Sequence, residues 1–297
     1  MIGFRLVTAA LQPLARIRAG KAQHSGRPDG PPAQRLRLPF RRIRDQVYTP
    51  AGWPQVLHAD VYVPKTEGPM PAVLLVHGGA WHTGNPGHTE LIAEKLARRG
   101  FVVVNATYRL APTARFPAPV KDLQQALRWM REHAAELRLD PQRIGAWGYS
   151  AGAHLVSLIG LLGPGDALYD PQVCVRAIVA GGVPSDMRKF RGGSLVPAFL
   201  GERWSKDSKV FRESSPVTYI RPDSPPVFLY HGGADRLVRP DQAVDFKAAL
   251  DAAGVRSELY LMPGLGHVMA NLLDGPAVQR GADFLDRELR GRTIRHE

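Results

Sequence analysis

The residues best suited to chemistry begin with a serine between glycines, Gly148-Tyr149-Ser150-Ala151-Gly152. This motif follows the apolar run 144–147 and precedes a helical stretch, residues 153–162. We therefore expect Ser150 on a tight strand-to-helix turn, with its hydroxyl projecting above a sheet. A chain with 30 glycines in 297 residues contains such a motif by chance in roughly one case in ten. The residues around the motif must therefore decide whether it marks a nucleophile.

An aspartate and a histidine follow the last two apolar runs and suit this serine. Asp235 comes after the run 227–230, and His267 comes after the run 259–262. A serine hydroxyl becomes a nucleophile when a histidine takes its proton and a carboxylate orients that histidine. The order Ser150, Asp235, His267 is the one expected in an open α/β sheet, so we predict that they form a catalytic triad. The residues weighed for these roles and set aside, on their positions relative to the strands, are His77, His82, His88, His154, His231, Asp223 and Asp241.

A second glycine motif, His77-Gly78-Gly79-Ala80-Trp81, directly follows the apolar run 72–76. Acyl transfer passes through a tetrahedral oxyanion, which needs N–H donors that are already in place. Glycine allows the backbone to approach that oxygen because it has no Cβ. We predict an oxyanion hole made by the N–H groups of Gly78, Gly79 and Ala151.

The elements that must position these residues are strands alternating with helices. Residues 57–63 alternate between apolar and polar side chains, as a half-buried strand does, and later apolar runs are typical of strands covered on both faces. These later runs are residues 72–76, 101–104, 144–147, 177–180, 227–230 and 259–262. Apolar spacings of three and four predict helices over 120–137 and 278–289. This alternation predicts an α/β fold, with a mostly parallel central sheet and helices on both faces.

The long interval between two of these runs predicts a helical cap insertion over about residues 183–224. A structureless loop of this length is unusual in a compact domain, and ligands in such sheets bind beyond the carboxyl ends of the strands. The cap is therefore placed to cover a site, although peripheral packing without a role in binding stays an alternative. The aromatic residues expected in the pocket walls are Trp81, Tyr149, Phe190, Phe199 and Trp204.

Length and composition limit the class of protein. A chain of 297 residues can bury a sizeable core, and 44% hydrophobic with 22% charged residues is typical of a globular protein. The single cysteine excludes an intrachain disulfide framework. No metal cluster and no dinucleotide-binding motif is apparent, so we predict neither a metal nor a cofactor.

The net charge of +12 is concentrated near the N-terminus. Residues 1–44 contain ten Lys or Arg and one acid, whereas the other 253 residues contain 29 basic and 26 acidic residues. Nucleic-acid binding predicts a basic excess on the folded body, so we expect no nucleic-acid partner. We predict a basic leader over residues 1–45 and one catalytic domain over residues 46–297.

Two interpretations of residues 1–20 stay open. Apolar side chains mixed with arginines, and no acid, suit an amphipathic segment that rests on an anionic membrane surface. The alternative is a solvated tail or a helix packed over the domain. We expect a cytoplasmic protein, with membrane association and export as the alternatives that this leader leaves open; no oligomeric state is predicted.

Together the motifs resemble those of serine hydrolases of the α/β-hydrolase superfamily, near its carboxylesterase and hormone-sensitive-lipase-like branches. The matching strings, spread over about residues 46–290, are 77–81, 108–112, 116–118, 140–144, 148–152, 215–216, 231–235 and 266–267. The resemblance implies an α/β-hydrolase fold and the triad and oxyanion hole named above. Hormone-sensitive-lipase-like esterases usually have Asp where Tyr149 stands and a third Gly where Ala80 stands. Residues 150–155 are also similar to kynurenine formamidases and isoprenylcysteine methylesterases.

The expected function is that of a serine carboxylesterase. It acts on small acyl esters through an acyl-enzyme intermediate on Ser150, so the expected partner is a small-molecule ester. The alternative is an arylformamidase, similar to kynurenine formamidases, or another amide hydrolase, because amide hydrolysis uses the same side chains.

Overall fold

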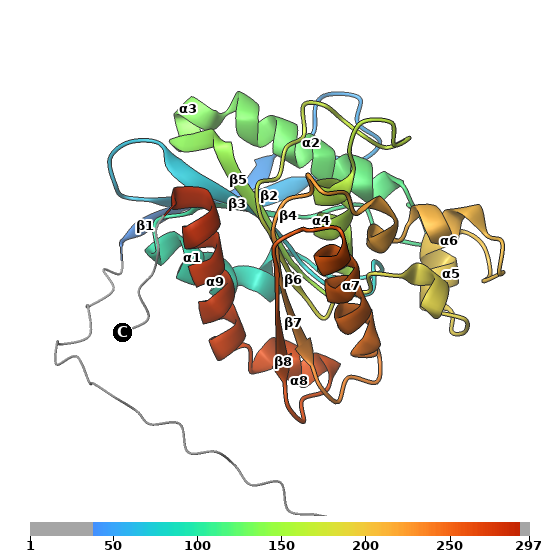
Figure 1. The fold of residues 1–297 in the computed structure, drawn as a ribbon. Coiled ribbons are helices and arrows are strands. Elements are labelled where there is room, and N and C mark those ends of the chain that lie inside the picture. Colours follow the sequence, from blue (N-terminus) through green and yellow to red (C-terminus); the bar gives the residue numbers. More distant parts are fainter. Residues whose placement is uncertain (1–37, 292–297) are drawn as a thin grey trace, which may run out of the picture. The chain divides into compact units, whose positions relative to one another are not determined.

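The computed structural model describes residues 38–291, in which eight strands form one sheet with the order β1-β2-β4-β3-β5-β6-β7-β8 (Figure 1). Strands β3 to β8 run parallel to one another, while β2 is antiparallel to both β1 and β4. The strands are β1 (Phe40–Val47), β2 (His58–Pro64), β3 (Met70–Val76), β4 (Val102–Ala106), β5 (Leu139–Tyr149), β6 (Ile178–Gly181), β7 (Val227–Gly232) and β8 (Ser257–Met262). The predicted mostly parallel sheet is confirmed.

Helices cover both faces of this sheet, as predicted. They are α1 (Glu90–Arg98), α2 (Ala118–Glu132), α3 (Ala134–Leu137), α4 (Ala151–Leu161), α5 (Leu195–Leu200), α6 (Lys209–Glu213), α7 (Asp241–Ala252), α8 (His267–Leu272) and α9 (Gly275–Arg290). One hydrophobic core contains side chains of α2, α4 and α7, and a second contains side chains of α1, α8 and α9. Figure 1 shows these two layers on either side of the strands.

Strand β3 shows why the central strands are apolar throughout. Leu74 and Val76 belong to the first core, whereas Val73 and Leu75 belong to the second. Successive side chains of a strand point to opposite faces, so a strand buried on both faces needs apolar residues at every position. All seven residues of β3 are buried.

Two predicted boundaries differ from the structure. The predicted leader extends to residue 45, but β1 begins at Phe40, so the last part of that segment belongs to the sheet. Three of the basic residues counted toward the leader, Arg41, Arg42 and Arg44, lie on this edge strand, where Arg42 pairs with Asp60 at 2.7 Å and with Glu90. The predicted helix 120–137 is interrupted at His133, between α2 and α3.

Short helices occupy the cap, residues 183–224. Besides α5 and α6 it contains two 3₁₀ turns, Met187–Lys189 and Pro216–Tyr219. Figure 1 shows α5 and α6 (yellow to orange) at the side of the molecule away from α1 and α9. Phe199 and Phe211 of the cap are fully buried in the first core, so the cap is packed onto the domain as part of one continuous core.

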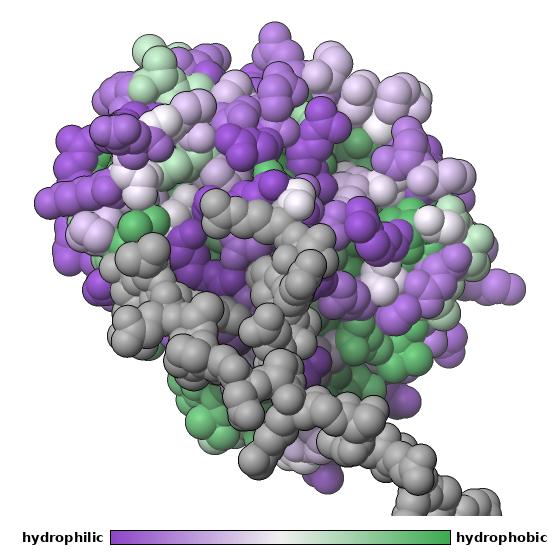
Figure 2. Space-filling model, turned by 60° about the vertical axis from the view of Figure 1, so that its left-hand side comes forward, coloured by the Kyte–Doolittle hydropathy of each residue, from purple (hydrophilic) through white to green (hydrophobic). Residues whose placement is uncertain are grey.

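The described surface is mainly hydrophilic on the face in Figure 2, with hydrophobic residues gathered toward its lower edge. Across residues 38–291, no helix combines the length and the apolar character that crossing a bilayer requires. The two interpretations of residues 1–20 concern residues outside this range.

Candidate active site

The turn between β5 and α4 presents Ser150. Its φ of 52° and ψ of −119° are rare for a residue with a side chain, and such strain is typical of a nucleophile turn. The N–H of Ser150 donates to the carbonyl of Gly181 at 2.8 Å, which fixes the turn to β6. A Cβ at Gly148 would lie 2.3 Å from the carbonyl carbon of Gly152, and a Cβ at Gly152 would lie 2.2 Å from the carbonyl oxygen of Val76. The two glycines are therefore required by the close packing of this turn.

Three side chains from three strand ends meet above this turn. His267 Nε2 lies 2.9 Å from Ser150 Oγ, and His267 Nδ1 lies 2.6 Å from Asp235 Oδ2. With its ring proton on Nδ1, His267 donates to the carboxylate and accepts the hydroxyl proton of Ser150. The structure thus brings together the three residues predicted as a triad, which are separated by up to 117 positions in the sequence.

Asp235 is held as a buried carboxylate. Its side chain is fully buried, and its Oδ1 accepts the N–H groups of Leu237 and Val238, both at 2.9 Å. Burial alone raises the pKa of a carboxyl group. Here hydrogen bonds from His231 and His267 outweigh burial and hold the pKa of Asp235 well below its ordinary value. The carboxylate is therefore ionised where it faces His267.

The glycine loop, residues 77–84, follows β3 and lies against Ser150. A Cβ at Gly78 would lie 2.9 Å from the carbonyl oxygen of Tyr149 and 3.4 Å from the Cβ of Ser150. Gly79 has a φ of 111°, and its carbonyl accepts the N–H of Thr83 at 3.0 Å. Among the hydrogen bonds of residues 38–291, none uses the N–H of Gly78 or Gly79. These groups are available to a ligand.

Ala151 is the first residue of α4. The N–H groups of a helix's first turn have no partner within the helix, and their orientation favours a negative charge. The three predicted oxyanion donors are thus on the two segments that flank Ser150, the glycine loop and the start of α4.

Two buried, neutral histidines make contacts beside the site, one with the glycine loop and one with Trp81 and the cap. His77 stacks on Tyr108 with ring centroids 4.6 Å apart, and its Nδ1 lies 2.7 Å from the carbonyl of Gly78. His154 accepts the indole N–H of Trp81 at 3.2 Å and contacts the carbonyl of Ser214 at 2.7 Å through Nε2. Burial lowers the pKa of each histidine to about 4, against the opposing effect of the hydrogen bond to a carbonyl. Neither ring contacts Ser150.

A pocket of about 340 Å³ opens onto Ser150 between the glycine loop and the cap. Of the predicted wall residues, Trp81 and Phe190 line it. Its other lining residues are Ala80, Pro184, Gly192, Gly193, Ser194, Leu195, Val196, Leu237 and Val238. No charged side chain is among them, so this pocket suits an uncharged, mainly apolar group.

Three predicted wall residues have other places. Phe199 is fully buried behind Trp81, on which it stacks at 4.6 Å. Trp204 lies farther out on the cap, where its indole N–H donates to the carbonyl of Arg188 at 2.9 Å. Tyr149 points away from the pocket and donates its hydroxyl to the carbonyl of His267 at 2.6 Å. The prediction that these three line the pocket is wrong, because the aromatic character of a residue does not indicate which side of a loop it covers.

Comparison with known proteins decides the family. The BD-FAE family model matches residues 59–250, well over half of the chain. The chain belongs to the BD-FAE family.

Two curated relatives of this BD-FAE chain come from Mycobacterium tuberculosis. Esterase LipQ is 29% identical over 230 residues, which cover 72% of this chain and 55% of that protein. Esterase LipC is 30% identical over 246 residues, which cover 76% of this chain and 60% of that protein. The chain thus spans 55% to 60% of the length of these curated relatives.

A solved structure is also similar to this BD-FAE chain. Thermogutta terrifontis esterase 2, in a form phosphoramylated by tabun, has a TM-score of 0.70 and 26% sequence identity, and the match covers 86% of this chain and 96% of that chain. These likenesses confirm the predicted α/β-hydrolase fold and the predicted resemblance to esterases of that superfamily.

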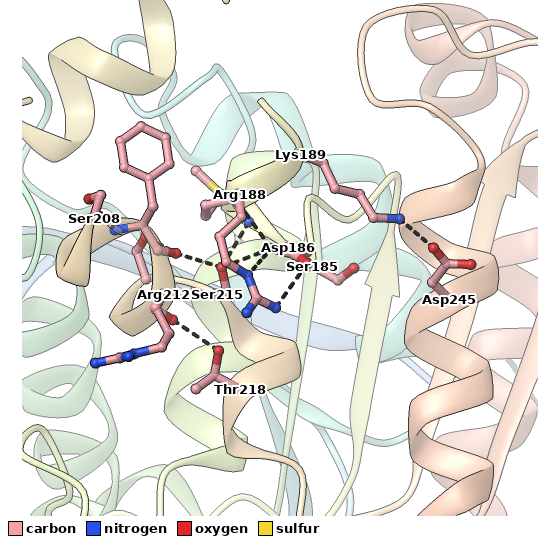
Figure 3. A network of polar contacts seen from close by, with 12 residues as sticks. Ser185, Asp186, Arg188, Lys189, Ser208, Arg212, Ser215, Thr218 and Asp245 are labelled. Carbon is pink, nitrogen blue, oxygen red and sulfur yellow. Dashed lines mark hydrogen bonds and ion pairs between the residues drawn. The ribbon is translucent and has the colours of Figure 1, made fainter. Parts of the chain in front are cut away.

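In this BD-FAE chain, residues 185–189 of the cap belong to a polar network, part of which is drawn in Figure 3. Gln242 of α7 is 2% exposed, and its side-chain oxygen accepts the N–H of Asp186 at 2.7 Å, while its Nε2 donates to the carbonyl of Asp186 at 3.0 Å. Ser185 donates to the backbone oxygen of Gln242 at 2.6 Å. Figure 3 shows the side chain of Lys189 extending toward Asp245. Lys189 Nζ donates to Asp245 Oδ2 at 2.5 Å. The network lies between two wall residues, Pro184 and Phe190.

Sequence reasoning missed several residues of the site. Leu237 and Val238 follow Asp235 in the same turn, and their closeness to a predicted triad residue was a usable signal. The pocket segment 192–196 carried no such signal, because its position depends on how the cap packs. Within the described range, no group of three or more His, Cys, Asp or Glu side chains is arranged to hold a metal ion.

Proposed function

We propose that this chain hydrolyses carboxylic esters with small, uncharged acyl groups, using Ser150 as nucleophile. The observation that carries the proposal is the hydrogen-bonded series Ser150, His267, Asp235, with distances of 2.9 and 2.6 Å, at the mouth of an apolar pocket. The names of the relatives support ester bonds as the target. A further structure of Thermogutta terrifontis esterase 2, 26% identical with a TM-score of 0.68, is described as propionate-bound, which supports a small acyl group.

The reaction follows from the roles of these groups. His267 takes the proton of Ser150 as its oxygen attacks the ester carbonyl, and Asp235 stabilises the imidazolium that forms. The developing oxyanion accepts hydrogen bonds from the N–H groups of Gly78, Gly79 and Ala151. His267 then gives its proton to the leaving alcohol. A water molecule, deprotonated by the same histidine, releases the acid and restores the Ser150 hydroxyl.

The pocket lining supports a dependence on acyl length. Each buried methylene contributes at most about 0.8 kcal/mol, so kcat/KM rises by up to about fourfold per added carbon until the pocket is filled. A charged acyl group lacks a partner among the lining residues, and leaving a charge unpaired there is costly.

A panel of nitrophenyl esters tests the proposal, from acetate to decanoate, with a succinate monoester as the charged member. The wild-type chain is expected to prefer a short or medium neutral ester, and Ser150→Ala is expected to lose several orders of magnitude in kcat while it stays folded. Equal activity of Ser150→Ala and wild type would contradict the proposal. Faster hydrolysis of an N-formylaniline than of every ester would assign the reaction to amides instead.

A further inference from the structure

Tyr149 makes two contacts with His267 but does not line the pocket. Its hydroxyl donates to the backbone oxygen of His267 at 2.6 Å, and the two ring centroids are 5.2 Å apart with an angle of 43° between the ring planes. Tyr149 is 5% exposed and directly precedes Ser150. One short segment, residues 149–150, therefore contacts both ends of His267, its backbone and its ring Nε2.

The segment that carries His267 has few other attachments. Helix α8 has six residues, and among them Ala270 alone is buried. Val268 is 65% exposed and Leu272 is 66% exposed. The loop before α8 is attached mainly through Leu265, whose carbonyl accepts the N–H of Ala234 at 3.0 Å and whose partly buried side chain packs against the second core. A helix this short, with so little buried surface, does not fix the ring position of its first residue.

The surroundings of Tyr149 keep its hydroxyl in contact with His267. A Cβ at Gly182 would lie 2.9 Å from Tyr149 Cζ and 3.0 Å from His267 Cε1, so only a glycine leaves room for both rings. On its other side Tyr149 packs against Tyr230, with ring centroids 5.9 Å apart. Burial raises the pKa of Tyr149, so its hydroxyl keeps its proton and remains a donor.

We propose that Tyr149 is a positioning residue for His267: its hydroxyl holds the backbone of residue 267 so that the imidazole stays within reach of Ser150. This inference rests on the proposed function, because it assigns the purpose of the contact to proton transfer. Tyr149 does not touch the reacting atoms and acts through His267.

The matched variants are Tyr149→Phe and Tyr230→Phe. Each removes one buried hydroxyl from the same group of aromatic rings, but the hydroxyl of Tyr230 accepts the indole N–H of Trp147 at 3.3 Å and is not bonded to His267. For Tyr149→Phe we expect kcat to fall about tenfold to a hundredfold, since small misplacements of a catalytic group have effects of this size. KM stays within about twofold, because the pocket is unchanged. For Tyr230→Phe we expect kcat within about twofold of wild type, with a similar loss of thermal stability.

Two further measurements make the result independent of stability. The rate at which a fluorophosphonate labels Ser150 is expected to fall with kcat in Tyr149→Phe, and amide hydrogen exchange in residues 267–272 is expected to become faster. Wild-type kcat and labelling rate in Tyr149→Phe would overturn the positioning role while leaving the proposed function in place. Equal losses of kcat in both variants would also overturn it, because they would indicate general destabilisation. A wild-type chain that neither hydrolyses esters nor reacts with the fluorophosphonate would remove both proposals.

Discussion

Trp81 donates its indole N–H to Nδ1 of His154 at 3.2 Å, and so joins the glycine loop to the helix that follows Ser150. Nε2 of the same imidazole, protonated, then donates to the carbonyl of Ser214 in the cap. One neutral histidine therefore connects the pocket wall, helix α4 and the cap. It can accept from Trp81 only while Nδ1 carries no proton.

This arrangement predicts acid-sensitive stability. The folded chain binds a proton at His154 only near pH 4, whereas the unfolded chain binds it near pH 6.5. The stability contribution is therefore fully present above about pH 6.5 and is lost as the pH falls toward 4, by about 3 kcal/mol for this residue. We expect the free energy of unfolding of His154→Gln, measured by urea titration from pH 7.5 to 4.5, to fall less steeply with acid than that of wild type. Parallel curves for the two proteins would contradict the assignment.

Gly182 is predicted to be required for activity more than for stability. An alanine there has a strained φ of 54°, and its Cβ meets Tyr149 and His267 at 2.9 and 3.0 Å. Because one of these neighbours is the proposed base, we expect Gly182→Ala to lower kcat by at least tenfold. Gly165→Ala is the control, since Gly165 also has a positive φ, 92°, but no atom within 4 Å of an added Cβ.

Both variants should lose about 1 kcal/mol of unfolding free energy from backbone strain, and Gly182→Ala should lose more because its Cβ also displaces Tyr149 or His267. Only Gly182→Ala should lose turnover beyond that expected from its unfolded fraction. Similar kcat values in the two variants would show that the space beside His267 is not critical.

Much of the fold and of the site was predictable from the sequence. Continuous apolar runs such as 72–76 indicate strands directly, because burial on both faces leaves no position for a polar residue. Ser150, Asp235 and His267 each follow such a run, and parallel strands place their carboxyl ends at one edge. Strand β1 was hidden because its exposed edge carries arginines. The position of Tyr149 was also unpredictable, since its contact with His267 joins residues 118 positions apart.

The two hydrogen bonds between the Gln242 side chain and the backbone of Asp186, here called the Gln242 clamp, are predicted to control substrate binding. Gln242→Met keeps the side-chain volume but leaves the N–H of Asp186 without its partner, at a cost of about 1–3 kcal/mol in unfolding free energy. The carbonyl of Asp186 then keeps only the N–H of Lys189, at 3.2 Å. The adjoining wall residues Pro184 and Phe190 then lose a fixed position, so we expect KM for the preferred ester to rise about three- to tenfold with a smaller change in kcat. Steady-state kinetics and thermal unfolding measure the two effects.

Lys189→Met is the matched control for this clamp. Lys189 also joins the cap to α7, through Asp241 and Asp245, but these carboxylates are 43% and 63% exposed, and exposed ion pairs contribute less than about 1 kcal/mol. Its KM should stay within about twofold of wild type. If Lys189→Met raised KM as much as Gln242→Met, the ion pairs of Lys189, and not the hydrogen bonds of Gln242, would fix the position of the pocket wall.

Asp235→Asn is predicted to separate orientation from folding. An amide at this position cannot offer His267 Nδ1 a charged acceptor, and a change of this kind in a triad reduces kcat by about 10³- to 10⁴-fold. Asp241→Asn is the control, because Asp241 lies at the start of α7 and does not contact the triad.

The same carboxylate sets an expectation for the pH profile. Since the wild-type pKa of Asp235 is held well below its ordinary value, its carboxylate stays ionised at every pH above 4. Ionisation of Asp235 therefore causes no inflection in kcat/KM between pH 4.5 and 9. A variant within tenfold of wild type over this range would contradict the role of Asp235, whereas a parallel loss in fluorophosphonate labelling of Ser150 supports it.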